Sequence, residues 1–203
     1  MKIINLGGVG GCRITDCLIK TNIRQVAYPF DWNNTNQFFP INVIKSQGKI
    51  FFSFQDQYVI TPKHLVSPCD NAFLCHDFNG DWKTKKEIVN QKYQRRLQRL
   101  LTKFNSSDTI YFVREVIEER GFRDHDDVFD YVPTFNVVHD KISEWEKFMN
   151  YCSVVRKCKT KLILFTVNPR LKSKREDIKI VLWDRINNPE TIIKENLIKI
   201  DNE

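Results

Sequence analysis

The sequence predicts an α/β fold, organised as a single three-layer domain over residues 1–203 with a mostly parallel sheet. Its length and composition suit one globular domain, because 41% of the residues are hydrophobic and 28% are charged. Apolar runs of strand length alternate with segments of helical periodicity along the chain. The most apolar run, residues 161–167 (KLILFTV), is typical of a parallel strand that is covered on both faces.

The first half of the chain contains several short strand-like runs and two helical segments. Residues 2–6 (KIINL) are apolar and lead into glycines, which predicts the first strand. Apolar residues recur at helical spacing over residues 12–21, and a second helix is expected at 35–46, interrupted near Pro40. Further strands are expected at residues 25–28, 49–54, 58–60 and 72–75.

The second half contains the clearest helix, residues 85–104, in which Val89, Tyr93 and Leu97 belong to one apolar stripe. The remaining expected elements are a strand at 108–114, a long acidic loop at 115–133, a helix at 138–157, strands at 161–167 and 178–183, a short helix at 187–195 and an edge strand at 197–200. In an open parallel sheet, ligands bind beyond the carboxyl ends of the strands.

The net charge of +7 is concentrated in one segment. Residues 83–103 hold eight lysines and arginines against one glutamate, whereas residues 115–130 hold seven acids against two arginines. The basic segment is expected to meet an anionic ligand, to pair with the acidic loop of the same chain, or to form a solvated helix face. No recognised nucleic-acid motif accompanies it, so specific nucleic-acid binding ranks below the other functions.

The apolar runs, the first residues and the cysteine spacing predict where the protein is located and whether it binds a metal. No apolar run approaches the roughly 18–20 residues of a membrane span, so no membrane partner is expected. The first residues lack the apolar region of a signal peptide, which predicts a protein kept in the reducing cytoplasm. The six cysteines lack the C-x₂₋₄-C spacing of a structural zinc site, and neither a metal nor a cofactor is expected.

The glycine-rich turn of residues 7–12 (GGVGGC) between the first strand and the first helix is the most informative local feature. One interpretation is a phosphate cradle at a helix N-terminus. The dinucleotide pattern then has Arg13 where its third glycine should be, although Asp31 lies where a ribose-binding acid would. A second interpretation is a turn that presents Cys12 to a substrate, and a third is that Cys12 is a small packed residue.

In the second interpretation, the helix start would activate the thiol. Backbone N–H groups and the helix dipole favour the Cys12 thiolate, and the N–H groups of Gly10 and Gly11 would bind the oxyanion of an acyl intermediate. A nucleophilic cysteine needs a base, and His76 is the best-placed histidine, because it follows the strand at 72–75 and precedes Asp77.

Four arginines are candidates for substrate binding. Three of them are expected on one ridge of the basic helix, where they would clamp a carboxylate or phosphate or pair with the acidic loop: Arg95, Arg96 and Arg99. Arg114 ends a strand at the edge of the sheet where ligands bind. Asp31 is expected either to cap the following turn or to form an ion pair with Arg24 or Arg114.

Several of these motifs occur in order: Cys12, Arg24, Pro29-Phe30-Asp31-Trp32, Leu74-x-His76-Asp77-Phe78, Lys92-Tyr93-x-Arg95-Arg96-Leu97-x-Arg99 and Tyr111-Phe112-Val113-Arg114. This order resembles the papain-like cysteine peptidase family of bacteria and large DNA viruses, over residues 1–115. The resemblance implies Cys12 as nucleophile and His76 as base, with Asp77 or Asp31 orienting the imidazole.

We therefore expect a thiol-dependent hydrolase or acyltransferase that acts on an acyl or peptide substrate. A phosphate- or nucleotide-binding α/β module is the first alternative. The second is an inactive viral structural or assembly component, located in the host cytoplasm or the virion, with virion or assembly proteins as partners. The abundance of Lys, Ile and Asn permits such a large-virus origin.

Overall fold

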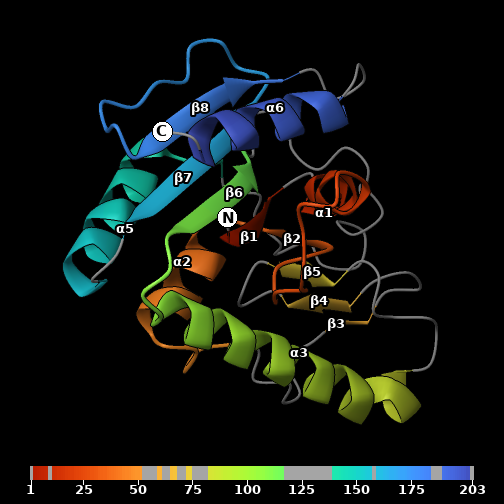
Figure 1. The fold of residues 1–203 in the computed structure, drawn as a ribbon. Helices are drawn as coiled ribbons and strands as arrows, with labels where there is room; N and C mark the ends of the chain where they lie inside the picture. Colours follow the sequence, from red (N-terminus) through yellow and green to blue (C-terminus); the bar gives the residue numbers. More distant parts are fainter. Residues whose placement is uncertain are drawn as a thin grey trace.

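A four-stranded, all-parallel sheet forms the centre of the molecule, with helices on both of its faces (Figure 1). Its strands, in spatial order, are β1 (Lys2–Gly8), β6 (Ile110–Glu115), β7 (Thr160–Thr166) and β8 (Ile178–Leu182). This sheet confirms the predicted α/β class. The computed structural model describes residues 2–8, 11–51, 59–60, 65–67, 72–74, 82–116, 139–156, 159–183 and 189–201.

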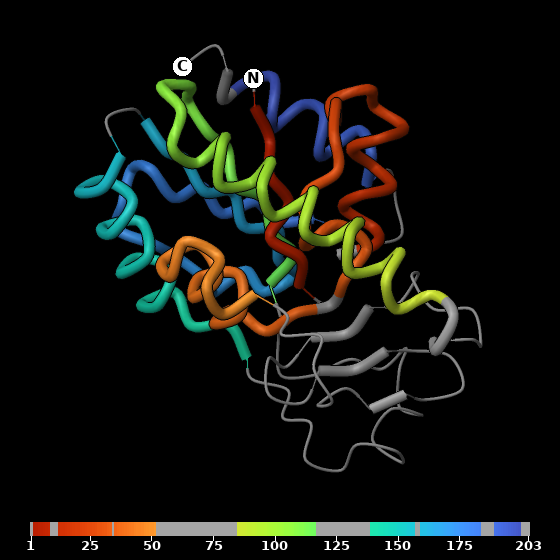
Figure 2. The backbone as a smooth tube through the Cα atoms, turned by 90° about the horizontal axis from the view of Figure 1, so that it is seen from below, coloured from red at the N-terminus to blue at the C-terminus, as the bar shows by residue number. Residues whose placement is uncertain are grey.

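The helices divide between the two faces of the sheet, which gives three layers. The helices are α1 (Gly11–Lys20), α2 (Phe38–Lys45), α3 (Trp82–Phe104), α5 (Ile142–Val155) and α6 (Pro189–Asp201). Side chains of α2, α3 and α5 form one apolar core with the sheet, and those of α1 and α6 form the other. Figure 2 shows α3 crossing in front of β1.

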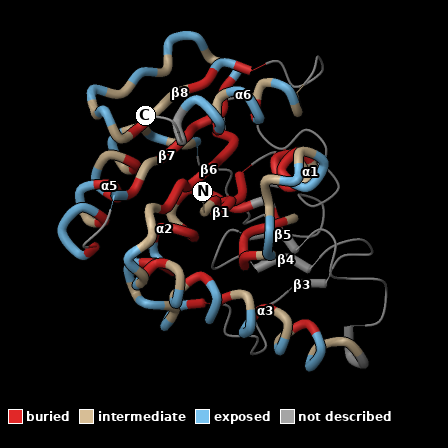
Figure 3. Tube along the Cα trace, viewed as in Figure 1, coloured by how far each residue is buried: buried red, intermediate tan, exposed pale blue. Residues whose placement is uncertain are grey.

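Successive side chains of the central strands pack alternately into the two apolar cores. Phe112 and Leu164 pack on the side of α3 and α5, whereas Tyr111 and Ile163 pack on the side of α1 and α6. Successive side chains of a strand point to opposite faces, so strands buried on both faces have apolar residues at consecutive positions. The buried residues accordingly follow β1, β6 and β7 through the middle of the molecule (Figure 3).

A second, smaller sheet was not expected from the sequence. It is antiparallel, and its strands in spatial order are β2 (Asn33–Thr35), β5 (Ala72–Leu74), β4 (Leu65–Ser67) and β3 (Val59–Ile60). Strand β2 also lies against β1. Because β5 pairs with β2 in the antiparallel sense, β5 runs toward the residue that precedes Asn33.

The structure corrects several sequence-based boundaries. Residues 25–28 do not form a strand, because Gln25 and Val26 are exposed and no neighbouring strand pairs with them among the described residues. Residues 49–51 lie in a turn instead of a strand, and 52–54 lie outside the described residues.

The C-terminal end is one helix, α6, rather than a short helix followed by an edge strand. The apolar run at 197–200 suggested a strand, but Ile193 and Leu197 lie four residues apart and are both buried against α1 and the sheet. None of the helices in the described parts of the chain is long and apolar enough to cross a membrane.

Candidate functional site

Cys12 lies in the first turn of α1, at the carboxyl edge of the parallel sheet. Strand β1 ends at Gly8 and α1 begins at Gly11, so Cys12 follows the carboxyl end of β1 by four residues. The Cys12 side chain is partly exposed, and its Sγ donates a hydrogen bond to the backbone carbonyl of Trp32 at 3.3 Å. Cys12 is therefore only partly buried, and its thiol is held toward the 28–32 turn.

Trp32 has an unusual backbone conformation that holds this carbonyl beside the thiol. Its φ angle is 66°, in the left-handed region, which costs a bulky L-residue roughly 1–2 kcal/mol. Its N–H donates to the Thr15 hydroxyl at 3.3 Å while its carbonyl accepts from Cys12. Contacts with two residues one turn apart on α1 thus maintain the strained conformation.

A buried polar network joins the end of β1, helix α1 and the 28–32 turn. The Thr15 hydroxyl accepts from the Asn5 amide at 2.9 Å and donates to the Asp31 carboxylate at 3.5 Å. The Asn5 side-chain oxygen accepts from the N–H of Gly7 at 3.0 Å. All of these side chains are buried, so the network fixes the geometry around Cys12.

Asp31, one of the two expected orienting acids, is held mainly by its own turn. Its carboxylate accepts from Arg24 Nε at 3.0 Å and from the Tyr28 N–H at 2.7 Å. Burial raises the pKa of the Asp31 carboxyl, while Arg24 and the Tyr28 N–H partly oppose that rise. The predicted pairing with Arg24 is present, and these contacts give Asp31 the role of positioning the turn that carries Trp32.

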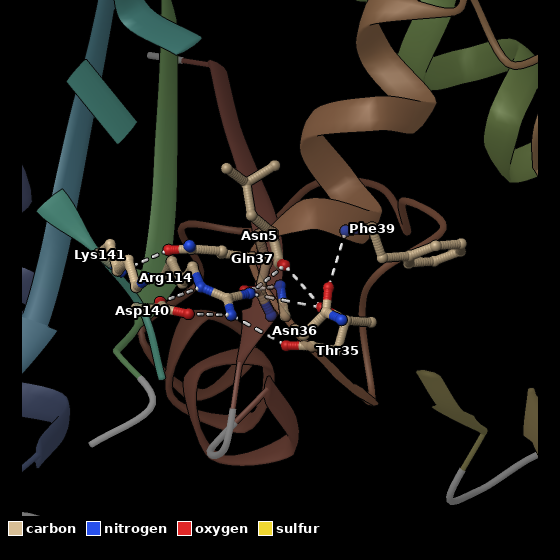
Figure 4. A network of polar contacts seen from close by, with 10 residues as sticks. Asn5, Thr35, Asn36, Gln37, Phe39, Arg114, Asp140 and Lys141 are labelled. Atoms are coloured by element: carbon tan, nitrogen blue, oxygen red, sulfur yellow. Dashed lines mark hydrogen bonds and ion pairs between the residues drawn. The ribbon is translucent and has the colours of Figure 1, made fainter. Parts of the chain in front are cut away.

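Arg114 was expected to contact a substrate, and the structure corrects this expectation. Its side chain is completely buried, and it forms a bidentate pair with Asp140 at 2.6 and 2.8 Å (Figure 4). Its remaining N–H groups donate to the Leu6 carbonyl and to both oxygens of Thr35. The guanidinium also lies over the Trp145 ring, 5.2 Å from its centroid. All five N–H donors are used inside the protein, so Arg114 is structural.

The same region of Figure 4 shows how the start of α2 is tied to residues 140–141. The Gln37 side-chain oxygen accepts from the N–H of Lys141 at 2.6 Å. The Asn36 side-chain oxygen accepts from the N–H of Phe39, the second residue of α2, at 3.0 Å. Together with the Arg114–Asp140 pair, these bonds join β1, β2, β6 and the segment before α5.

The three helix arginines do not share one ridge. Arg96 is half-buried and lies over the Tyr93 ring, 5.5 Å from its centroid. Its charge favours the ionised form of Asp31, which opposes part of the rise that burial causes in the pKa of that carboxyl. Arg95 and Arg99 are exposed and line a hollow beside Tyr28. Adjacent residues of a helix point about 100° apart, which separates Arg96 from Arg95.

Three of the predicted site residues, Gly10, His76 and Asp77, lie outside the described residues. Gly11 is the first residue of α1. The last described residue before His76 is Leu74, which pairs with Asn33, the neighbour of Trp32. The chain thus approaches the Cys12–Trp32 contact from β5.

Close packing requires glycine at positions 7 and 8, whether or not a ligand binds there. A Cβ atom on Gly7 would lie 2.6 Å from Thr35 Oγ1, and one on Gly8 would overlap the carbonyl oxygen of Glu115. Both glycines have positive φ angles, 74° and 119°. They let β1 approach β2 and β6 closely, which accounts for them without a phosphate.

Glu115 lies at the carboxyl edge of the sheet, where the sequence predicts a loop. It is the last residue of β6, opposite Gly8, and its side chain is fully buried. Its carboxylate lies 3.8 Å from Arg13, the residue after Cys12. A buried carboxylate beside the glycine turn disfavours an anionic ligand there. The sequence feature that indicates a buried Glu115 is the run IYFVRE, in which the strand continues through two charged residues.

The other described cysteines, Cys17 and Cys152, are buried, and burial raises the pKa of their thiols to about 11 and about 12. Since the thiolate is the reactive form, we expect iodoacetamide at pH 8 to label Cys12 about a hundredfold faster than either. Timed labelling followed by peptide mass spectrometry measures the three rates. Equal rates in the native protein would contradict the burial of Cys17 and Cys152, and equal rates in guanidinium chloride are the control.

The fold and the site define an α/β protein whose helix-start cysteine is partly exposed at the carboxyl edge of a parallel sheet. Among known proteins, no family model, curated protein or solved structure matches the chain. Within the described residues, no group of three His, Cys, Asp or Glu side chains could hold a metal ion.

Proposed function

We propose that this protein is a thiol-dependent hydrolase or acyltransferase with Cys12 as its nucleophile. The observation that carries the proposal is the placement of a partly exposed thiol in the first turn of α1, at the carboxyl edge of the sheet. This edge is where open α/β sheets bind ligands, and the helix N-terminus favours the thiolate over the thiol. The two buried thiols, Cys17 and Cys152, lack this environment.

His76 is the proposed general base. Covalent geometry keeps its Cα within about 7 Å of that of Leu74, whatever the conformation of the intervening residue. Leu74 lies opposite Asn33, next to the Trp32 carbonyl that Cys12 contacts. This connection supports an imidazole within reach of the Cys12 sulfur, and Asp77 is the acid proposed to orient it.

The proposed reaction forms and breaks one thioester. His76 takes the proton of Cys12, and the thiolate then attacks the carbonyl carbon of the substrate while backbone N–H groups of the first turn of α1 stabilise the oxyanion. The imidazolium then protonates the leaving group as the bond to it breaks. Water or an acceptor nucleophile, deprotonated by His76, attacks the thioester and releases Cys12.

The Trp32 carbonyl contacts Cys12 only while the thiol is protonated. A carbonyl oxygen accepts the proton of a thiol but has nothing to accept from a thiolate, so its contact with Cys12 belongs to the protonated form of the site, below the apparent pKa of Cys12. Deprotonation therefore requires the S–H bond to turn from Trp32 toward His76. The polar network through Thr15 keeps the backbone of Trp32 in place while this happens.

The test is the pH profile of Cys12 alkylation in the wild type and in His76→Ala. We expect an apparent pKa below about 7 in the wild type and a value near the ordinary 8.5 in His76→Ala. His139→Ala is the matched control, because it removes an exposed histidine elsewhere and should leave the profile unchanged. Peptide mass spectrometry separates Cys12 from the other thiols.

An unshifted profile, or one that His139→Ala changes as much as His76→Ala, would overturn the proposal. A shifted profile justifies screening esters, amides and peptides as substrates. In that screen, Cys12→Ser should reduce turnover at least about a hundredfold, since the serine hydroxyl stays protonated at neutral pH.

A further inference from the structure

A shallow groove lies along the C-terminal half of α3, at the other end of β1 from Cys12. It consists of two adjoining hollows of about 480 and about 180 Å³. Val26, Tyr28 and Lys103 line both of them, and the smaller hollow extends to Lys2 and Ile3 at the start of β1. We call this feature the α3 groove.

The ionisable side chains on the walls of the α3 groove are all basic except for that of Tyr28: Lys2, Arg95, Arg99 and Lys103. Lys103 forms an ion pair with Asp108. No acidic side chain among the described residues forms an ion pair with Arg95 or Arg99, which are both exposed. The groove therefore presents two arginines available to an anionic partner.

The floor of the groove is apolar. Ile3, Ile23 and Val26 contribute aliphatic surface, and the Tyr28 ring contributes aromatic surface although the residue is only 5% exposed. A partner that fits this floor carries an apolar side chain as well as negative charge. Proteins that bind single-stranded nucleic acids stack the bases on exposed aromatic rings. The described residues of the α3 groove include no exposed aromatic ring.

The spacing of the basic residues on α3 is close to the side-chain repeat of an extended peptide. Arg95, Arg99 and Lys103 follow one another at four-residue intervals on α3, which places them about 6 Å apart along the helix axis. In an extended peptide, side chains on the same face recur every two residues, at about 6.6 Å. Alternate acidic residues of an extended peptide therefore match the row of cations.

We propose that the α3 groove is a docking site for an extended acidic peptide segment, with acidic residues at alternate positions and an apolar side chain between them. The basic residues of α3 would hold the carboxylates, and Val26 and Tyr28 would contact the apolar side chain. This proposal goes beyond the thiol chemistry of Cys12 and does not depend on it.

The test uses a fluorescein-labelled peptide of Glu-Ser repeats with one central leucine, titrated with the full-length protein at low salt and followed by anisotropy. We expect saturable binding that Arg95→Gln/Arg99→Gln weakens about tenfold. Arg170→Gln/Lys172→Gln is the matched control, because it removes two exposed cations from a loop outside the groove and should change the affinity less than about twofold.

Three further measurements separate the possible outcomes. Val26→Asp places a negative charge on the floor of the groove and should also weaken binding, without removing a cation. A single-stranded oligonucleotide that binds more tightly than the peptide, and loses affinity in Arg95→Gln/Arg99→Gln, would overturn the proposal in favour of a polynucleotide. No saturable peptide binding, or equal losses in both double variants, would also overturn it. Unchanged peptide binding by Cys12→Ser separates this site from the proposed active site.

Discussion

Replacing Arg114 with methionine is expected to lower the free energy of unfolding by about 3–5 kcal/mol, because the change leaves Asp140 as a buried charge without its partner. The ion-pair side chains of both residues are almost completely buried, so water cannot replace the lost contacts. The variant also loses the bonds that the guanidinium makes to Leu6 and Thr35. Urea denaturation of the variant and the wild type measures the difference.

The double variant Arg114→Met/Asp140→Leu is the control for this experiment. Removing both charges eliminates the unpaired carboxylate, so the double variant should be more stable than Arg114→Met alone. If Arg114→Met alone were as stable as the wild type, the buried pair would not hold β6 to the segment before α5, and the structural assignment of Arg114 would be wrong.

Replacing Gly8 with alanine is the second change with a large expected effect, a loss of about 3 kcal/mol or more in the free energy of unfolding. The new Cβ would overlap the carbonyl oxygen of Glu115, which is a backbone atom in a central strand and cannot turn aside. The φ angle of 119° adds strain for any residue with a side chain. Thermal or urea denaturation gives the magnitude.

Gly48→Ala is the matched control for Gly8→Ala. Gly48 also has a positive φ angle, 80°, but its Cβ would meet only the ends of the Leu97 and Leu101 side chains. The expected loss is therefore limited to about 1–2 kcal/mol, the ordinary cost of left-handed backbone in alanine. Equal losses in the two variants would mean that close strand approach at Gly8 contributes nothing.

The parallel core of the fold could be predicted from the sequence because its signal is local. The runs that became β6 and β7 each contain four consecutive apolar residues, and α3 has an apolar stripe from Val89 to Phe104. The second sheet could not be predicted in the same way. Its strands are two or three residues long, and such short segments become strands only through their partners.

The position of Cys12 at the start of a helix could also be predicted, because a strand, a glycine turn and a helical pattern follow one another directly. The role of Arg114 could not, since its partner Asp140 is distant in the sequence and no pattern connects the two. The same holds for the Trp32 carbonyl beside Cys12, which depends on a left-handed conformation that nothing in a tryptophan predicts.

The pairing of β1 with β6 has a consequence for how the chain is made. The first strand pairs with a segment more than a hundred residues later, as in the register Lys2–Ile110. At a synthesis rate of about 5–20 residues per second, the apolar β1 leaves the ribosome several seconds before its partner exists. Closing so long a loop also slows folding. The helix that carries Cys12 therefore gains its support from the sheet late, and a nascent chain exposes an apolar strand that chaperones would recognise.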